Sequence, residues 1–105
     1  MSSHQPVVRV WRGVIRTQER DEYVEYVERT GMAQYRSTPG NLDAWILTRD
    51  LGDGTSEILT VSRWESMNAV RSFAGPDVDQ AVYYPEDDDY LVDRDETVRH
   101  YAQDA

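Results

Sequence analysis

The sequence has 105 residues, of which 11 are basic and 20 are acidic, so its formal net charge at pH 7 is -9. That length suits one domain with a single core, and we expect residues 1–105 to form it, with residues 1–6 as a flexible tail. The acidic balance argues against nucleic acid and against anionic membranes as partners, because both attract basic surfaces. The sequence has no cysteine, which excludes disulfides, thiolate catalysis and thiolate metal sites.

Targeting signals are not visible in this sequence. Residues 1–6 lack the basic region and the following apolar run that are typical of a signal peptide. No apolar stretch approaches the ~20 residues that a membrane-spanning helix needs. We therefore expect a cytoplasmic protein.

The first third of the chain predicts a strand followed by a helix. Val7–Ile15 is rich in β-branched and aromatic residues, which favours a strand. We expect a helix from about Gln18, with Thr17 as its N-cap. Its inner face is predicted from residues at helical spacing, namely Tyr23, Tyr26, Val27 and Thr30. Gly31 is expected to weaken or kink this helix, and residues 37–41 to end it.

The middle of the chain predicts a β-hairpin and a second helix. Two β-rich runs, Leu42–Arg49 and Thr55–Trp64, flank the turn sequence Asp50–Gly54. Ser66 then caps a predicted helix that ends at Ala74. The end of a strand beside the start of a helix is a common place for a small-molecule cleft.

The last third predicts one further strand and completes the fold. Residues 77–93 give no clear pattern, whereas Glu96–Tyr101 indicates a last strand. The order of elements is then β-α-β-β-α-β, which is an α+β, ferredoxin-like arrangement with an antiparallel sheet.

One predicted strand is apolar on both of its faces. Trp45 and Leu47 occupy the face opposite Leu42, Ala44 and Ile46. A sheet with helices on only one side should have a polar second face. Because this second face is apolar, we expect it to pack on another copy of the chain in a homodimer.

Four short motifs give the chain a family resemblance. They are residues 9–13, residues 38–41, the Trp64-Glu65-Ser66 tripeptide and residues 83–88. With them the chain resembles the antibiotic biosynthesis monooxygenase family of dimeric α/β-barrel proteins. The resemblance implies a homodimer whose sheets face each other, with a pocket between each sheet and its own helices. Some members oxidise polycyclic phenols or anthrones with molecular oxygen and no cofactor, and others degrade haem.

The haem branch of the family fits this sequence poorly. Those relatives use a histidine on the second helix, an asparagine on the first strand and a tryptophan at a strand end. Only Trp64 matches, because the predicted second helix has no histidine and the first strand has no asparagine. The two histidines are His4, in the expected tail, and His100, on the last strand. We therefore expect no cofactor.

A metal site is also not expected. The acidic run of residues 86–89 lacks the spaced carboxylates, the glycine and the terminal glutamate of a calcium loop. Adjacent carboxylates point in different directions, which favours a solvated acidic loop.

Oxygenation without a cofactor needs a base and donors that stabilise an oxyanion. We predict catalytic roles for Arg9, Trp64 and His100, as donors or as a base. The predicted substrate-binding residues are Trp11, Asn41, Phe73, Tyr83 and Tyr84. The two tyrosines are further candidates for acid or base chemistry.

Each candidate also has a structural interpretation. Trp64 suits a core position that joins strand to helix. Arg9, which lies among valines, suits an ion pair at a dimer interface equally well. Asn41 suits the turn that follows Pro39-Gly40, and His100 suits a structural position. Tyr83 and Tyr84 suit either a lid over the pocket or contact with a neighbouring subunit.

The leading hypothesis is a cofactor-independent monooxygenase that acts on an aromatic or polyketide-like small molecule. A cyclase or isomerase that uses the same pocket is the second hypothesis, and a non-catalytic small-molecule binding protein is the third. The identity of the substrate stays open.

Overall fold

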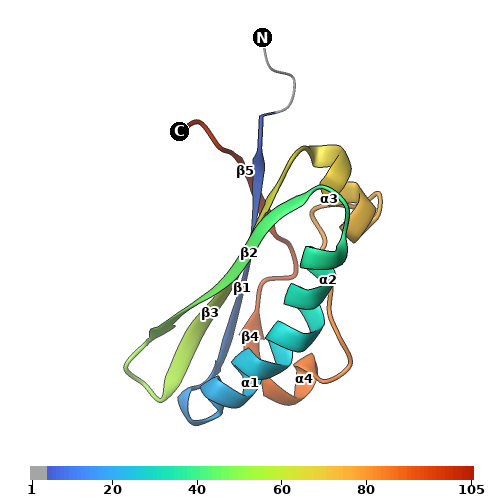
Figure 1. Ribbon diagram of the computed structural model, residues 1–105. Coiled ribbons are helices and arrows are strands. Elements are labelled where there is room, and N and C mark those ends of the chain that lie inside the picture. Colours follow the sequence, from blue (N-terminus) through green and yellow to red (C-terminus); the bar gives the residue numbers. More distant parts are fainter. Residues whose placement is uncertain (1–4) are drawn as a thin grey trace.

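The computed structural model describes residues 5–105, which form one antiparallel sheet with helices on one face (Figure 1). The strands of this part of the chain are β1 (Val7–Arg16), β2 (Asn41–Asp50), β3 (Thr55–Trp64), β4 (Leu91–Arg94) and β5 (Arg99–Ala102). Their order is β2-β3-β1-β4, and β5 also pairs with β1. This order and the antiparallel pairing confirm the predicted ferredoxin-like α+β fold.

The helical layer is built mainly from the segment between β1 and β2. This segment contains a 3-10 turn (Thr17–Glu19), α1 (Arg20–Val27), a π-helical turn (Glu28–Met32) and α2 (Ala33–Ser37). Two shorter segments complete the layer: α3 (Met67–Ala74), which follows β3, and α4 (Asp87–Tyr90), which precedes β4. Figure 1 shows the α1–α2 segment running along the sheet, with α3 and α4 at opposite ends of the layer. None of the helices described in residues 5–105 is long and apolar enough to cross a membrane.

The two predicted helix caps have different outcomes. Ser66 caps α3 as expected, because its Oγ accepts a hydrogen bond from the Ala69 amide at 3.2 Å. Thr17 does not cap α1. Its Oγ1 lies 2.8 Å from the Ser56 hydroxyl of β3, so the chain makes a 3-10 turn before α1 begins at Arg20. The prediction for Thr17 is therefore wrong, because a tertiary partner takes its hydroxyl.

Gly31 lies in the π-helical turn, where the helix widens without breaking. Thr30, in the same turn, donates its hydroxyl to the Tyr26 carbonyl at 2.8 Å. The weakening that was expected at Gly31 is therefore a change of helical pitch, and α2 continues beyond it.

The predicted last strand needs correction. The edge of the sheet beside β1 is formed by β4 and β5, which pair with residues 13–15 and 7–10 of β1. Between them the chain leaves β1, because the Val98 amide bonds the Asp79 carbonyl at 2.8 Å and the Ala81 amide bonds the Glu96 carbonyl at 3.0 Å. The strand predicted over residues 96–101 is thus shortened at its start by contacts with the segment that follows α3.

The described part of the expected tail is bound to the C-terminus. The Gln5 side-chain amide donates to the Gln103 carbonyl at 3.2 Å, and the Pro6 carbonyl accepts from the Gln103 amide at 2.9 Å. The rest of the expected tail, residues 1–4, lies outside the described residues.

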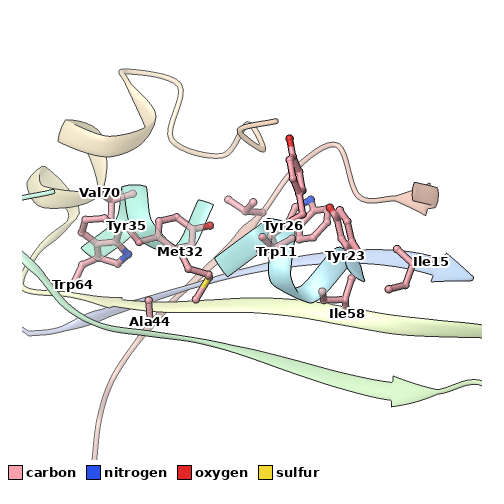
Figure 2. Packing of buried hydrophobic residues seen from close by; sticks show 12 residues of the cluster. Trp11, Ile15, Tyr23, Tyr26, Met32, Tyr35, Ala44, Ile58, Trp64 and Val70 are labelled. Carbon is pink, nitrogen blue, oxygen red and sulfur yellow. The ribbon is translucent and has the colours of Figure 1, made fainter. Parts of the chain in front are cut away.

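The core lies between the sheet and the helices (Figure 2). Trp64 packs beside Tyr35 and Val70 at the α3 end, and Tyr23 packs near Ile58 at the other end. Burial of these large side chains supplies most of the apolar stabilisation of the fold.

The opposite face of the sheet, here called the outer face, carries exposed apolar side chains on β2, and ion pairs of Glu57 with Arg12 and Arg49 lie beside them. Trp45 is 38% exposed and Leu47 is 47% exposed. Register places further apolar residues on the same face: Val8, Val10, Leu59, Val61 and Tyr101. The prediction of an apolar second face therefore holds for Trp45 and Leu47 of β2, whereas the face also carries charged residues.

Gly13 leaves the space that the Trp11 indole fills. A Cβ at Gly13 would lie 2.5 Å from Trp11 Cη2 and 2.8 Å from Leu91 Cδ2. Gly13→Ala should therefore lower the free energy of unfolding, measured with urea, by about 1–3 kcal/mol. Gly31→Ala is the matched control, because its Cβ would meet only the Tyr84 ring, at 3.7 Å. Equal losses of stability in the two variants would contradict this interpretation.

Candidate functional site

A cavity of about 30 Å³ lies between β1 and the helical layer. Six of its fourteen lining residues are aromatic, and they come from the sheet, the helices and the segment after α3: Trp11, Tyr23, Tyr35, Phe73, Tyr83 and Tyr84. Two charged side chains, Arg9 and Asp87, also line it. Its volume is enough for about two water molecules. An aromatic cavity with a few polar groups is the usual form of a small-molecule site.

Arg9 is a buried cation whose Nε has no hydrogen-bond partner among the described residues. Its side chain is 1% exposed, and its guanidinium donates to the Val78 carbonyl at 2.5 Å and to the Gln80 carbonyl at 3.1 Å. Burial lowers the pKa of Arg9, but an arginine so placed stays charged near neutral pH. Among the described residues, nothing accepts a hydrogen bond from its Nε. A buried donor without an acceptor costs about 1–3 kcal/mol, so an acceptor in the cavity would recover that energy.

The Arg9 guanidinium also lies over an aromatic ring. Its Cζ is 5.6 Å from the centre of the Phe73 ring on α3. Arg9 therefore joins β1, α3 and the segment after α3 at one end of the cavity.

His100 lies behind Arg9 and is not among the residues that line the cavity. Its Nε2 is 3.0 Å from Arg9 Nη1, which can only donate, so Nε2 accepts and Nδ1 carries the proton. Nδ1 lies 3.2 Å from Asp79 Oδ1. Burial, and then the positive charge of Arg9, lower the pKa of His100. These contacts orient Arg9, while the catalytic role of His100 stays a prediction.

His100 should make stability depend on pH. The pKa of His100 is about 6.5 in the unfolded chain and lower in the folded protein. As the pH falls, the unfolded state therefore takes up the proton first. The stability contributed by neutral His100 is present above about pH 6.5 and is lost as the pH falls through the folded pKa. In urea unfolding, the wild-type protein should lose more stability than His100→Gln between about pH 7.5 and about pH 5. Equal losses would contradict the neutral state of His100.

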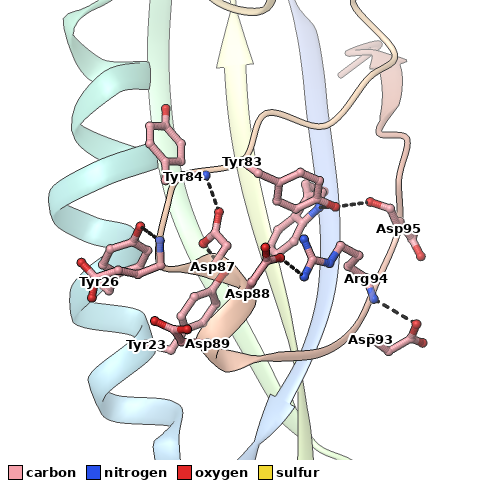
Figure 3. Close-up of polar contacts among 12 residues, drawn as sticks. Tyr23, Tyr26, Tyr83, Tyr84, Asp87, Asp88, Asp89, Asp93, Arg94 and Asp95 are labelled. Carbon is pink, nitrogen blue, oxygen red and sulfur yellow. Dashed lines mark hydrogen bonds and ion pairs between the residues drawn. The ribbon is translucent and has the colours of Figure 1, made fainter.

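Trp11 and Tyr83 form one wall of the cavity together. The Trp11 indole N–H donates to the Tyr83 hydroxyl at 3.3 Å, and that hydroxyl donates to the Asp95 carbonyl at 2.7 Å. The guanidinium of Arg94 lies 4.7 Å from the centre of the Tyr83 ring. Burial raises the pKa of Tyr83, so its hydroxyl stays protonated at neutral pH. Figure 3 shows Tyr83 and Tyr84 on the segment that closes over the sheet.

Asp87 was missed by the sequence analysis. It belongs to the acidic run predicted as a solvated loop, yet its side chain is only 5% exposed and it lines the cavity. Its carboxylate accepts from the Tyr23 hydroxyl at 2.9 Å and from the Tyr84 amide at 2.7 Å. Burial raises the pKa of Asp87 above its ordinary range. The prediction of a solvated loop is wrong for Asp87, because α1 covers it, whereas the other acidic residues of this run are exposed.

Tyr84 lies beside Asp87 and also lines the cavity. Burial raises the pKa of Tyr84 to about 12, so its hydroxyl keeps its proton at neutral pH. Tyr84 therefore offers a hydrogen-bond donor at the wall rather than a base.

Two other predicted site residues do not line this cavity. Trp64 is fully buried, packs edge to face on Tyr35 with ring centres 6.0 Å apart, and donates its indole N–H to the Ser62 hydroxyl at 2.9 Å. Asn41 donates its amide to backbone carbonyls of its own strand pair. Both positions are explained by packing and by strand pairing, so functional roles for these residues stay predictions.

Haem does not fit the residues that line the cavity. The helix that would carry the axial histidine, α3, has none, and both ring nitrogens of His100 are engaged by Arg9 and Asp79. Within residues 5–105, no group of three His, Cys, Asp or Glu side chains could hold a metal ion.

No protein-family model matches the sequence, and no curated protein matches it. Solved structures with the same fold do match along nearly the whole chain. A Bacillus cereus protein provisionally named an antibiotic biosynthesis monooxygenase is 17% identical, with a TM-score of 0.69 over 96% of this chain and 95% of that chain. A variant of SnoaB, a cofactor-independent oxygenase from Streptomyces nogalater, is 19% identical, with a TM-score of 0.57 over 96% and 93%.

A third match is the heme-degrading protein Rv3592 from Mycobacterium tuberculosis, in a heme-free form. It is 16% identical, with a TM-score of 0.65 over 98% of this chain and 96% of that chain. At these low sequence identities, the matches show the fold of this chain and not its chemistry. The chain thus has the fold of the antibiotic biosynthesis monooxygenase structures, as its resemblance to that family predicted.

Proposed function

We propose that the protein binds a small acidic aromatic molecule as its anion beside Arg9 and oxidises it with molecular oxygen, without a cofactor. The observation that carries this proposal is the free Nε donor of Arg9, which is buried at the wall of an aromatic cavity. A charge-assisted hydrogen bond to an anionic oxygen would satisfy this donor. The fold shared with a cofactor-independent oxygenase supports the choice of reaction.

The proposed reaction needs a substrate that is electron-rich once it has lost a proton. An anthrone-type methylene group, flanked by two aromatic rings, loses a proton to a base, and its negative charge spreads to the ring oxygen. The anion passes an electron to oxygen, and the two radicals combine into a peroxide anion, which takes back the proton from the base. Loss of water leaves a quinone, with one oxygen atom in the product and the other in the water. The role of Arg9 is to stabilise the anion that reacts.

The volume of the cavity implies movement on binding. About 30 Å³ is far below the roughly 300–1,000 Å³ of an ordinary small-molecule pocket. The segment of residues 77–86 lines the cavity with Val82, Tyr83 and Tyr84, and it is held to Arg9 through the Val78 and Gln80 carbonyls. We propose that this segment, with Tyr83 and Tyr84, opens as a lid when the substrate enters.

Oxygen uptake tests the proposed reaction. Purified metal-free protein should consume oxygen with anthrone at a rate above the spontaneous oxidation, and should release the quinone with one oxygen consumed per molecule. The same incubation without oxygen should give no product. If the protein binds anthrone without consuming oxygen, it is a binding protein and the oxygenase proposal is contradicted.

A second candidate function is proton transfer without oxygen, as in a cyclase or isomerase. The buried carboxylate of Asp87 favours it, because a base at the wall of an apolar cavity suits either reaction. Formation of a rearranged product in the absence of oxygen would support this second function over the first.

We also propose that the outer face joins two copies of the chain. Trp45 and Leu47 lie two residues apart on this face and are both exposed in a single chain, and neighbouring exposed apolar residues often mark a protein–protein contact. Leu47→Glu should shift the protein from dimer to monomer in sedimentation equilibrium, because two buried carboxylates would face the interface. Gln34→Glu adds the same charge on α2 and should leave the dimer intact. A monomeric wild-type protein would contradict the proposal.

A further inference from the structure

Asp87 is a buried carboxylate at the cavity wall that the proposed reaction has not yet used. Its side chain is 5% exposed. Within residues 5–105, none of the ion pairs includes Asp87, and the nearby Arg94 pairs with Asp88 at 2.5 Å instead. Burying a carboxylate without a cation is costly, and such groups are concentrated at functional sites.

The local structure does not require a negative charge at this position. The hydrogen bond from the Tyr84 amide to Asp87 closes a turn over residues 84–87, and the hydrogen bond from the Tyr23 hydroxyl joins that turn to α1 (Figure 3). A neutral acceptor such as an asparagine oxygen could accept bonds of this kind. Each carboxylate oxygen of Asp87 has a second lone pair, so the group keeps acceptor capacity for a ligand in the cavity.

Asp87 and Arg9 both line the cavity, and they are linked to opposite ends of the helical layer. Arg9 lies over Phe73 of α3, whereas Asp87 begins α4, and Figure 1 shows these helices at opposite ends of the helical layer. Trp11 lines the wall and lies two residues from Arg9 on β1, a distance of about 7 Å along the strand. A flat ligand along the Trp11 wall would therefore have a cation near one edge and a carboxylate near the other.

We propose that Asp87 is the base that takes the proton from the ligand, at the edge opposite the oxygen that Arg9 binds. This inference rests on the proposed function and adds to it the residue that acts as the base. The C–H bond breaks, the proton goes to an Asp87 carboxylate oxygen, and the electron pair stays in the ligand as charge on its oxygen. The substrate is the anthrone-type ring ketone of the proposed function, whose acidic carbon lies across the ring from its carbonyl.

Hydrogen exchange separates this proton transfer from the reaction with oxygen. Under anaerobic conditions in deuterated buffer, wild-type protein should exchange the methylene protons of anthrone faster than buffer does, measured by proton NMR. Asp87→Asn should lower the protein-catalysed exchange rate by at least about 100-fold, which is the usual contribution of a general base. Asp89→Asn, at an exposed carboxylate two residues away, should keep the wild-type rate.

The outcomes distinguish the two proposals. Exchange that depends on Asp87, together with no oxygen uptake, would support the role of Asp87 and overturn the oxygenase. Wild-type oxygen uptake with unchanged exchange in Asp87→Asn would overturn the role of Asp87 and leave the oxygenase standing. Absence of exchange in the wild-type protein would also overturn the role of Asp87.

A second variant tests Asp87 without altering it. The exchange rate should rise with pH as Asp87 loses its proton. The bond from Tyr23 favours the charged carboxylate, so Tyr23→Phe should raise the pKa of Asp87 and move the midpoint of the pH–rate curve to higher pH. Asp87 is also faced by other titratable or charged groups, which both proteins keep: Tyr83, Tyr84, Asp88 and Arg94. An unchanged midpoint in Tyr23→Phe would contradict the proposal.

Discussion

Arg9→Met should bind the anion of an anthrone-type phenol about 10- to 100-fold more weakly than the wild-type protein. A hydrogen bond from a charged donor contributes about 1.5–3 kcal/mol, and each 1.4 kcal/mol corresponds to a factor of ten in affinity. Methionine keeps an apolar side chain of similar length but offers no donor from the position of Nε. The fluorescence of Trp11, at the cavity wall, provides the binding signal.

Two controls separate loss of the donor from loss of structure in this experiment. Arg20→Met removes a half-exposed guanidinium from α1 and should leave the affinity unchanged. Arg9→Lys keeps the positive charge but loses the planar guanidinium. Its affinity for the anion should lie between those of the wild-type protein and Arg9→Met. Wild-type affinity in Arg9→Met, with folding verified by circular dichroism, would show that the anion binds elsewhere.

Trp64→Ala should lower the free energy of unfolding by about 3–5 kcal/mol, among the largest losses that a single substitution in this core can cause. The indole is fully buried and packs on Tyr35 and Phe73, with ring centres 6.0 Å and 5.9 Å away. Trp45→Ala is the matched control on the outer face, measured at a concentration where the protein is monomeric. Its loss in urea unfolding should be smaller, because Trp45 is 38% exposed in a single chain.

Trp64→Phe distinguishes packing from a catalytic role of the indole. Phenylalanine keeps most of the ring packing but cannot donate, so it leaves the Ser62 hydroxyl without its present partner. If Trp64 acts through packing, this variant should be less destabilised than Trp64→Ala and should keep oxygen uptake. Loss of oxygen uptake in a stable Trp64→Phe protein would instead support the donor role predicted from the sequence.

The elements with strong local signals were predictable from the sequence. The hairpin follows from two β-rich runs around a glycine-rich turn, and α3 follows from its apolar spacing and from Ser66 as its cap. The apolar second face could be predicted because strand alternation alone places Trp45 and Leu47 opposite Ala44. Arg9 could be singled out because a cation among valines needs a partner.

Features set by distant contacts could not be predicted in this way. Asp87 is buried because Tyr23, 64 residues earlier, contacts it, and no local pattern separates it from its acidic neighbours. The edge beside β1 is divided into two strands because residues 96–98 bond to the segment after α3. For Trp64 a local signal did exist, since Ser62 lies on the same face of β3 and can accept its indole proton.

The most direct test of the anion site is a crystal structure of the protein with an anthrone-type phenol, grown without oxygen. The proposed site predicts the ligand between the sheet and the helices, with its charged oxygen within hydrogen-bonding distance of Arg9 Nε. It also predicts that the segment of residues 77–86 has moved away from the sheet. A ligand bound on the outer face, or an Arg9 Nε that bonds only to protein, would contradict the account.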